Sequence, residues 1–473
     1  MDDIASYLND HEHKNLLRFI TCGSVDDGKS TLIGRLLFDS KLIYDDQLSS
    51  LQDVSAKSGT TGAGEIDYAL LLDGLKAERE QGITIDVAYR YFSTPQRKFI
   101  IADTPGHEQY TRNMATGAST ANLAIILIDA RYGVVTQTRR HAFIASLLGI
   151  RHLLVAVNKM DIGGYQEATF LGIRDAFAAF ASDLDIPDIR FVPISALKGT
   201  NVVAPSPALT PWYTGPSLLT LLETVDVSQD INQTDFRFPV QVVIRPHLNF
   251  RGFAGTVASG AVKPGDRIRV LPSGKTSRVK RIVTADGDLP EAFAPQAVTL
   301  ELEDEIDISS GDMIVHDGNP PRVADLFEAT VIWMSETPLR PGAQVLARHA
   351  GRFVKARIES LIYAVDVNTM ERKPAAELPL NGIGRVVVST TLPLYLDPYA
   401  VNHATGSLIF VEPISNVTSG AAMVVSADAE APASGVRPET RLLRVTGPAP
   451  AFPAFEGEFR ALLAKHGLRA DET

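Results

Sequence analysis

A glycine-rich loop near the start of the chain carries the residue types that bind phosphate. Residues 23–30 fit the pattern G-x-x-x-x-G-K-[ST], after an apolar run and before a stretch that favours helix. The backbone N–H groups of such a loop and of the helix N-terminus form a concave site for phosphate oxygens. We expect Lys29 to reach the β- and γ-phosphates and Ser30 to ligate Mg²⁺. The predicted nucleoside triphosphate site is lined by Gly23, Ser24, Val25, Asp26, Asp27, Gly28, Lys29, Ser30 and Thr31.

Two later segments indicate which nucleotide base is bound. Asn158, Lys159 and Asp161 form an Asn-Lys-x-Asp motif at the end of an apolar run. A carboxylate at Asp161 accepts from N1–H and the exocyclic amine of guanine, whereas adenine would leave that carboxylate unpaired. We expect Asn158 to tie its loop to the phosphate loop and the Lys159 stem to lie against the purine. The backbone of the next strand-end loop, formed by Ser195, Ala196 and Leu197, is placed to donate to guanine O6.

A third motif contains the residues expected to hydrolyse the bound nucleotide. Asp103 and Gly106 begin an Asp-x-x-Gly loop that ends in His107. We expect Asp103 to hold Mg²⁺ through a water, Gly106 to meet the γ-phosphate and His107 to orient the attacking water. Thr84 lies between this loop and the phosphate loop, where its hydroxyl would complete the Mg²⁺ shell only with the γ-phosphate present. Residues 40–86 are therefore predicted to be a switch segment, and the catalytic residues to be Lys29, Thr84 and His107.

Other charged groups close to these motifs have simpler interpretations. Asp26 and Asp27 add negative charge beside the phosphates, which we expect Mg²⁺ or a monovalent cation to offset. The run Arg139, Arg140 and His141 is interpreted as a solvated helix face rather than an ion site.

The elements that must position these residues alternate between strand and helix. Apolar runs at 17–21, 98–102, 123–129, 153–158 and 190–194 are separated by helix-compatible segments at 30–38, 137–148 and 166–181. This alternation predicts an α/β P-loop G domain with a doubly wound, mostly parallel sheet over residues 1–225. After about residue 225, closely spaced β-branched runs with turn signals predict two β-barrel domains, at 229–322 and 323–427. Residues 428–473, rich in Ala and Pro, are expected to be a loosely ordered tail.

The composition of the chain limits where the protein can be located and what it can bind. The chain has 473 residues, a net charge of -11 and one cysteine, Cys22, so an intramolecular disulfide and a thiolate cluster are excluded. The acidic balance argues against nucleic-acid binding, which needs a basic face. The acidic start of the chain differs from a secretory signal, and we find no apolar run long enough to span a membrane. We therefore expect a cytoplasmic protein with no membrane association.

With these motifs in place, residues 15–200 resemble the translation-factor class of GTPases, which share the stretches found here at 82–85 and 103–107. The β-rich blocks resemble the two barrels that follow the G domain in elongation factors. More narrowly, the chain resembles the large GTPase subunit of the bacterial two-subunit sulfate adenylyltransferase (ATP sulfurylase). The similar stretches are residues 24–37, 81–92, 103–119, 250–260 and 263–266.

That resemblance implies a division of labour. A smaller partner subunit would bind ATP and sulfate and carry adenylyl transfer, forming adenosine 5′-phosphosulfate and pyrophosphate. GTP hydrolysis by this chain, with GTP and Mg²⁺ bound, would be coupled to that uphill reaction in sulfate assimilation towards cysteine. Two alternatives stay open: an elongation-factor-type GTPase that binds RNA, which would share every residue of the G site, and a GTP-sensing scaffold with negligible turnover.

Overall fold

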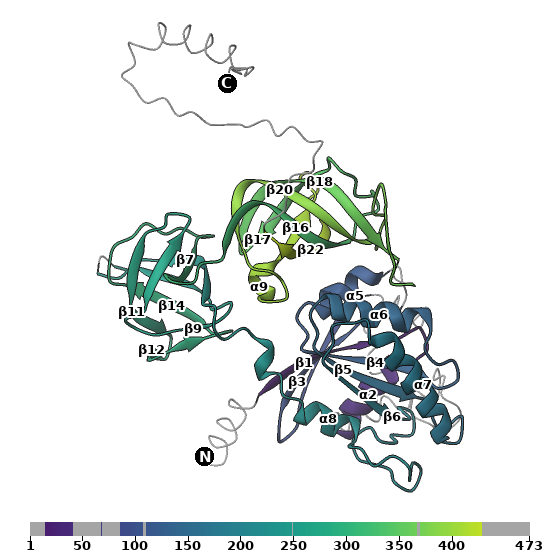
Figure 1. Cartoon of the computed structure of the whole chain (residues 1–473). Helices are drawn as coiled ribbons and strands as arrows, with labels where there is room; N and C mark the ends of the chain where they lie inside the picture. Colours follow the sequence, from purple (N-terminus) through teal and green to yellow (C-terminus); the bar gives the residue numbers. More distant parts are fainter. Residues whose placement is uncertain are drawn as a thin grey trace, which may run out of the picture. The chain divides into compact units, whose positions relative to one another are not determined.

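The computed structural model describes residues 15–40, 68, 86–106, 110–247, 249–366 and 369–427 (Figure 1). The predicted switch segment, Thr84, His107 and the tail after residue 427 lie outside this part of the chain, apart from residues 40, 68 and 86. Among the helices it describes, none has the length and apolar character needed to cross a membrane.

A mostly parallel sheet forms the first domain. Its strands are β1 (Leu16–Cys22), β2 (Ala88–Ser93), β3 (Lys98–Asp103), β4 (Leu123–Asp129), β5 (His152–Asn158) and β6 (Asp188–Pro193). They lie in the order β2-β3-β1-β4-β5-β6, and only the edge strand β2 runs antiparallel to its neighbour. The jump from β1 to a neighbour on either side is the switch point at which α/β sheets bind ligands, beyond the carboxyl ends of the strands.

Helices cover both faces of this sheet (Figure 1). They are α2 (Lys29–Asp39), α5 (Thr111–Ala118), α6 (Thr136–Leu147), α7 (Glu167–Ala181) and α8 (Leu218–Thr224). Every residue of β4 is buried, and alternate residues point into different clusters. Ala124, Ile126 and Ile128 pack with α5, α6 and α7, whereas Leu123, Ile125 and Leu127 pack with α2 and α8. Because both faces of such a parallel strand are buried, its sequence is a continuous apolar run.

The predicted doubly wound sheet is thus confirmed, with strand and helix limits within about two residues of the expected ones. Three elements were not predicted: the edge strand β2 and the short helices α5 and α8. A further prediction was wrong. His141 does not belong to a solvated face, because its side chain is buried with only 4% exposed, while Arg139 of the same run is exposed.

The second domain is a closed barrel that follows the short helix η3 (Ser228–Asp230). Its antiparallel strands pair in the order β10-β15-β7-β8-β14-β11, and pairing of β10 with β11 closes the ring. These strands are β7 (Arg237–Ile244), β8 (Gly252–Thr256), β10 (Arg267–Leu271), β11 (Thr276–Thr284), β14 (Ala297–Leu302) and β15 (Met313–His316). Shorter strands β9 (Ala261–Val262), β12 (Gly287–Leu289) and β13 (Ala292–Phe293) flank it.

The third domain is a closed barrel of the same kind, with the order β17-β21-β22-β16-β20-β18 and closure between β17 and β18. Its strands are β16 (Arg322–Trp333), β17 (Gln344–His349), β18 (Arg352–Val365), β20 (Ile383–Leu396), β21 (Ser407–Val411) and β22 (Thr418–Ser426), with β19 (Arg372–Lys373) added at the edge of β18. The helix α9 (His403–Gly406) precedes β21. The two expected barrels are therefore confirmed as a fold, while the domain limits placed at 225, 229, 322 and 427 remain predictions.

Polar contacts join the two barrels. Arg237 of β7 forms a buried, two-pronged ion pair with Asp397, at 2.9 and 3.0 Å. Thr405 donates to the same carboxylate over 2.6 Å, and Asn402 donates to Ser259 over 2.7 Å. Because these groups are buried and satisfied, they fix the two barrels to each other.

Candidate functional site

The phosphate loop is shaped by glycine at the point where it meets the Asn-Lys-x-Asp loop. β1 ends at Cys22 and α2 begins at Lys29, so residues 23–28 form the turn between them. Gly28 has φ of 92°, and a Cβ there would lie 2.5 Å from Nδ2 of Asn158. Only glycine fits this left-handed, crowded position. The glycine therefore lets the start of α2 approach the side chain of Asn158.

Lys29 lies beneath this loop. Its side chain is buried, and Nζ donates to the carbonyls of Gly23 (2.9 Å) and Ser24 (2.8 Å). Burial lowers the pKa of Lys29, against the opposing effect of Asp103 and Asp27. A lysine has three N–H donors, so one remains for a phosphate oxygen.

The Asp103–Gly106 loop reaches the same point from β3. A Cβ at Gly106 would lie 2.5 Å from Nζ of Lys29 and 2.7 Å from the carbonyl of Gly23, so glycine allows this close approach. Gln137 of α6 donates to the carbonyl of Gly106 over 3.3 Å. Asp103 is buried and accepts a hydrogen bond from Thr21 over 3.1 Å, while Thr104 donates back to the carbonyl of Thr21 over 2.6 Å. The two loops predicted to face the phosphates are thus held together.

The residues expected to hold Mg²⁺ offer oxygen ligands of the right chemistry. Asp103 supplies a buried carboxylate, and Ser30 supplies a half-buried hydroxyl in the first turn of α2. Within the described ranges there is no group of three or more His, Cys, Asp and Glu side chains that would bind a metal alone. Mg²⁺ at nucleotide sites uses one or two carboxylates together with phosphates and water, so this sparse donor set fits it. Thr84 and His107, the remaining predicted ligand and the predicted catalytic histidine, are not among the residues described.

Asp27 has a role that the sequence did not indicate. Its carboxylate is buried inside the phosphate loop, where it accepts from the backbone N–H of Ser24. Burial raises the pKa of Asp27, and the Ser24 bond and Lys29 oppose that rise. Protein donors therefore offset its charge. Asp26 adopts a left-handed φ of 67° and presents its carbonyl to Nζ of Lys159.

The base-reading loops converge on Asn158. Its Nδ2 donates to the carbonyl of Asp27 over 2.8 Å, and its Oδ1 accepts from the N–H of Ala196 over 2.9 Å. One amide thus joins the phosphate loop, the Asn-Lys-x-Asp loop and the 195–197 loop. The N–H of Ser195 donates to Thr200, so among the three expected donors to guanine O6 only Leu197 has no partner among the described residues. Asp161 is half-buried, and its carboxylate contacts no donor within the described chain.

Asp129 is a site residue that sequence reasoning missed. It ends β4 and is buried, and it pairs with Nζ of Lys159 at 3.0 Å and with Arg131 at 2.6 Å. Burial would raise the pKa of Asp129, but hydrogen bonds from Arg131 and Lys159 outweigh burial and lower the pKa to about 2. The carboxylate therefore stays ionised and fixes Lys159. The sequence places Asp129 at the end of a predicted strand, between the strand-end motifs of Asp103 and Asn158. That position could have identified Asp129 as a site residue.

Helix α6 brings further polar groups to the loop of Gly106. Thr138 and His141 are buried beside Gln137, and Oε1 of Gln137, Oγ1 of Thr138 and Nδ1 of His141 have no hydrogen-bond partner in the described chain. Burial, with Lys29 and Arg140, lowers the pKa of His141 to about 3, so its imidazole is neutral at any physiological pH. This side of the site is uncharged but polar.

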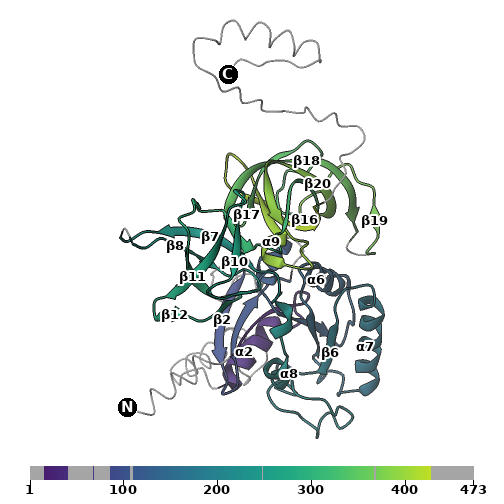
Figure 2. The same cartoon turned by 60° about the vertical axis from the view of Figure 1, so that its left-hand side comes forward.

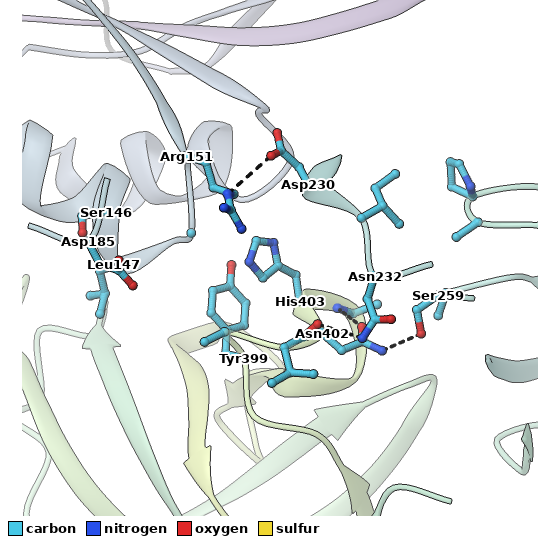
Figure 3. Close-up of a pocket in the computed structure, with 18 of the residues that line it drawn as sticks. Ser146, Leu147, Arg151, Asp185, Asp230, Asn232, Ser259, Tyr399, Asn402 and His403 are labelled. Carbon is cyan, nitrogen blue, oxygen red and sulfur yellow. Dashed lines mark hydrogen bonds and ion pairs between the residues drawn. The ribbon is translucent and has the colours of Figure 1, made fainter. Parts of the chain in front are cut away.

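A separate cavity of about 370 Å³ lies where the G domain meets both barrels (Figure 3). Arg151 and Asp230 in its wall pair at 3.6 Å. Asp230 also contacts His152 at 3.3 Å, and His152 contacts Asp188 at 2.8 Å. Tyr399 donates to the carbonyl of Leu148 over 2.9 Å. None of these residues touches the phosphate loop, so the cavity marks the connection between domains rather than the nucleotide site.

Comparison with known proteins agrees with this geometry. A family described as "Elongation factor Tu GTP binding domain" matches residues 14–229, and one described as "GTP-eEF1A C-terminal domain-like" matches residues 326–425. The sulfate adenylyltransferase subunit 1 of Laribacter hongkongensis is 58% identical over 98% of this chain and 95% of the relative. The bifunctional enzyme CysN/CysC of Rhodopirellula baltica is 60% identical over 89% of this chain, which spans 65% of that longer protein.

Among solved structures, the GTP-bound GTPase-like domain of Ski7 from S. cerevisiae matches 89% of this chain and 99% of its own, with a TM-score of 0.50 and 18% identity. At that identity the likeness concerns the fold alone.

Proposed function

The chain belongs to the family of sulfate adenylyltransferase subunit 1, and on that premise we propose how its residues bind and hydrolyse GTP and what the hydrolysis drives. It is the GTP-binding, GTP-hydrolysing subunit of a sulfate adenylyltransferase. The observation that carries the conclusion is the 58% identity over 98% of the chain, which includes both barrels as well as the G domain.

The nucleotide binds across the three loops that Asn158 joins. Apart from Ser24 and Asp27, whose N–H groups bond within the loop, the backbone N–H groups of residues 23–31 and the remaining N–H of Lys29 hold the β- and γ-phosphates. The Asp161 carboxylate accepts from guanine, with the Lys159 stem beside the purine and the backbone of 195–197 near O6. This arrangement is supported by the bonds of Asn158 to Asp27 and Ala196.

Hydrolysis is assigned to the groups around Gly106. Ser30, Asp103 and Thr84 would hold Mg²⁺, which supplies charge neutralisation at the β- and γ-phosphates when bound. His107 orients the attacking water, and Gly106 offers its N–H to the γ-phosphate. The roles of Thr84 and His107 rest on motif spacing, while those of Gly106 and Lys29 are supported by the close approach of the two loops.

The name "subunit 1" implies a second subunit. We assign ATP and sulfate binding and adenylyl transfer to that smaller partner, with products adenosine 5′-phosphosulfate and pyrophosphate. A phosphosulfate anhydride forms uphill, so hydrolysis by this chain would favour the conformation of the complex that forms it. We place the complex in the cytoplasm, without nucleic acid. The RNA-binding translation factor is disfavoured, because the identity to sulfate adenylyltransferase subunits extends through the barrels that would bind RNA.

Pyrophosphate release from ATP and sulfate by the purified complex, with and without GTP, tests the function. Stimulation by GTP that a non-hydrolysable analogue cannot replace is expected. If no sulfate-dependent pyrophosphate release is found at any GTP concentration, the proposal is overturned. In the same complex, with GTP hydrolysis followed as phosphate release, His107→Ala should lower GTP turnover roughly 10²-fold with GTP affinity nearly intact. Asp161→Asn should admit xanthine nucleotides, with the exposed Asp183→Asn as the matched control.

A further inference from the structure

Arg35 of α2 connects segments of the G domain that are distant in the sequence. Helix α2 lies on the face of the sheet that also carries α8 (Figure 2), and Leu36 of α2 packs in the same cluster as Ala196. The Arg35 side chain is only 17% exposed, and its Nε pairs with Asp39 of the next turn at 2.9 Å. This ion pair orients the guanidinium and leaves both Nη groups for other partners.

The guanidinium reaches the loop that follows β6. Nη1 of Arg35 donates to the carbonyl of Leu197 over 3.5 Å, which is long for a hydrogen bond. The packing beside it is tight, because a Cβ at Gly199 would lie 2.2 Å from Nη2 and 2.9 Å from Cζ of Arg35. Gly199 also has φ of 75°, a conformation that favours glycine. The guanidinium therefore lies directly against the backbone of this loop.

Tyr68 holds the same guanidinium. Nη1 of Arg35 donates to the Tyr68 hydroxyl over 2.9 Å, and Tyr68 is buried. The backbone of Tyr68 packs on α2 at Gly34, where a Cβ would lie 2.2 Å from the Tyr68 carbonyl oxygen. The Tyr68 ring also contacts Phe38, with ring centroids 5.1 Å apart. Because Tyr68 is itself fixed on the helix, it holds the guanidinium in place against the loop after β6.

We propose that Arg35 is a positioning residue for guanine recognition. It holds the 195–197 loop, whose backbone is assigned to guanine O6, and Tyr68 holds Arg35. The inference rests on the proposed function, because it requires guanine in the site. Arginine suits this role, since its planar guanidinium offers five N–H donors in a fixed fork and can hold several acceptors in one geometry. Tyr68 belongs to residues 40–86, the predicted switch segment, so the contact also joins that segment to the base-reading loop.

Binding of base-modified nucleotides to the full-length chain tests the positioning. 6-Thio-GDP replaces O6 by sulfur, a weak hydrogen-bond acceptor, and keeps the N1–H and the amine assigned to Asp161. IDP keeps O6 and lacks that amine. Wild type should bind both analogues more weakly than GDP. In Arg35→Met, which keeps a linear side chain without donors, the preference for GDP over 6-thio-GDP should fall ~3–10-fold, the range for one neutral hydrogen bond. The preference for GDP over IDP should be unchanged.

Two further variants complete the set. Tyr68→Phe removes only a hydroxyl, so it should lower the preference for GDP over 6-thio-GDP by a smaller factor. This variant decides the question if Arg35→Met does not fold. Arg174→Met makes the same substitution in α7, where Arg174 pairs with Asp175 at 2.8 Å, and its two preferences should match those of wild type.

The outcomes separate this inference from the function on which it rests. An unchanged preference for GDP over 6-thio-GDP in Arg35→Met, or in Tyr68→Phe where Arg35→Met does not fold, overturns the inference and leaves the proposed guanine site intact. Equal loss of both preferences also overturns it, because the substitution then loosens the whole site. If wild type binds GDP and 6-thio-GDP equally, the proposed recognition of O6 fails, and the inference fails with it.

Discussion

Asn158, at the end of β5, donates from Nδ2 to the carbonyl of Asp27 over 2.8 Å, joining residues 131 positions apart in the sequence. The same side chain accepts from Ala196 over 2.9 Å. The phosphate loop, the Asn-Lys-x-Asp loop and the 195–197 loop therefore share one buried amide, and a change in the position of one loop is transmitted to the others.

Asn158→Ala should weaken guanine nucleotide binding. The substitution leaves a buried carbonyl at Asp27 and a buried N–H at Ala196 without partners, each at a cost of ~1–3 kcal/mol. We expect GDP affinity, measured by titration of a fluorescent analogue, to fall at least ~10-fold. Asn201→Ala is the matched control, because Asn201 is equally buried and donates to Pro193 and Thr210 without touching the phosphate loop. Equal losses of affinity in both variants would show a general loss of stability instead.

Cys22 should be unreactive in the folded protein. The thiol is fully buried at the end of β1, and burial raises its pKa from 9.0 to about 12. Three pKa units reduce the thiolate fraction about 10³-fold, and the thiolate is the reacting species. Labelling by a thiol reagent near neutral pH should be slow in buffer and should reach one thiol per chain in denaturant. Rapid labelling of the native protein would contradict the burial of this strand end.

The sequence predicted an element correctly where its local hydrophobic pattern matches the way the element packs in the fold. Residues 123–129 were expected as a strand and form β4 with those limits, because a strand buried on both faces is apolar throughout. Helix α5 was missed, since its eight residues include Gly117 and only three, Met114, Ala115 and Ala118, are anchored in the core. Such a short helix is stabilised by packing rather than by its own propensity.

The same contrast applies to the site. Motifs identified the groups that face the nucleotide, but they did not reveal the residues that hold those groups. His141 was assigned to solvent from its charged neighbours Arg139 and Arg140, although it belongs to a buried face of α6 with Thr138, Ala142 and Ala145. Ile144 is buried as well, and the spacing of 138, 141, 142 and 145 is the periodicity of one helix face, which would have placed His141 inside. The internal bond of Asp27 to Ser24 depends on loop conformation, which the pattern G-x-x-x-x-G-K-[ST] leaves open.

The His152 contacts predict a pH-dependent connection between the G domain and the segment before the second domain. Contact with Asp230 raises the pKa of His152, burial opposes the rise, and Asp188 adds to it. A histidine with a raised folded-state pKa stabilises fully below its unfolded pKa of about 6.5, and the stabilisation is lost as pH rises through the folded value. Arg151 and His403 also face this region.

His152→Gln tests this dependence by thermal unfolding at a series of pH values. The midpoint of the variant should lie furthest below that of wild type near pH 6, and the difference should shrink as pH approaches 9. The effect should shrink when Asp230→Asn is already present, because only Asp188 then stabilises the imidazolium. A difference between variant and wild type that is constant with pH would mean that His152 acts by packing alone.

The ion pair of Arg237 with Asp397 should account for much of the cohesion between the two barrels. Arg237 is among the largest fully buried side chains, and besides Asp397 its guanidinium donates to the carbonyls of Phe236 and Asn319, at 3.0 and 2.8 Å. Removing one partner of a buried pair leaves an uncompensated charge, so Asp397→Ala should lower the free energy of unfolding by ~3–5 kcal/mol. Arg237→Met with Asp397→Leu removes both charges and keeps apolar volume, so the double variant should be more stable than Asp397→Ala. Chemical denaturation of the double variant and of its two single variants, Arg237→Met and Asp397→Leu, gives the coupling energy, and additive effects would contradict a direct interaction between the two charges across the barrels.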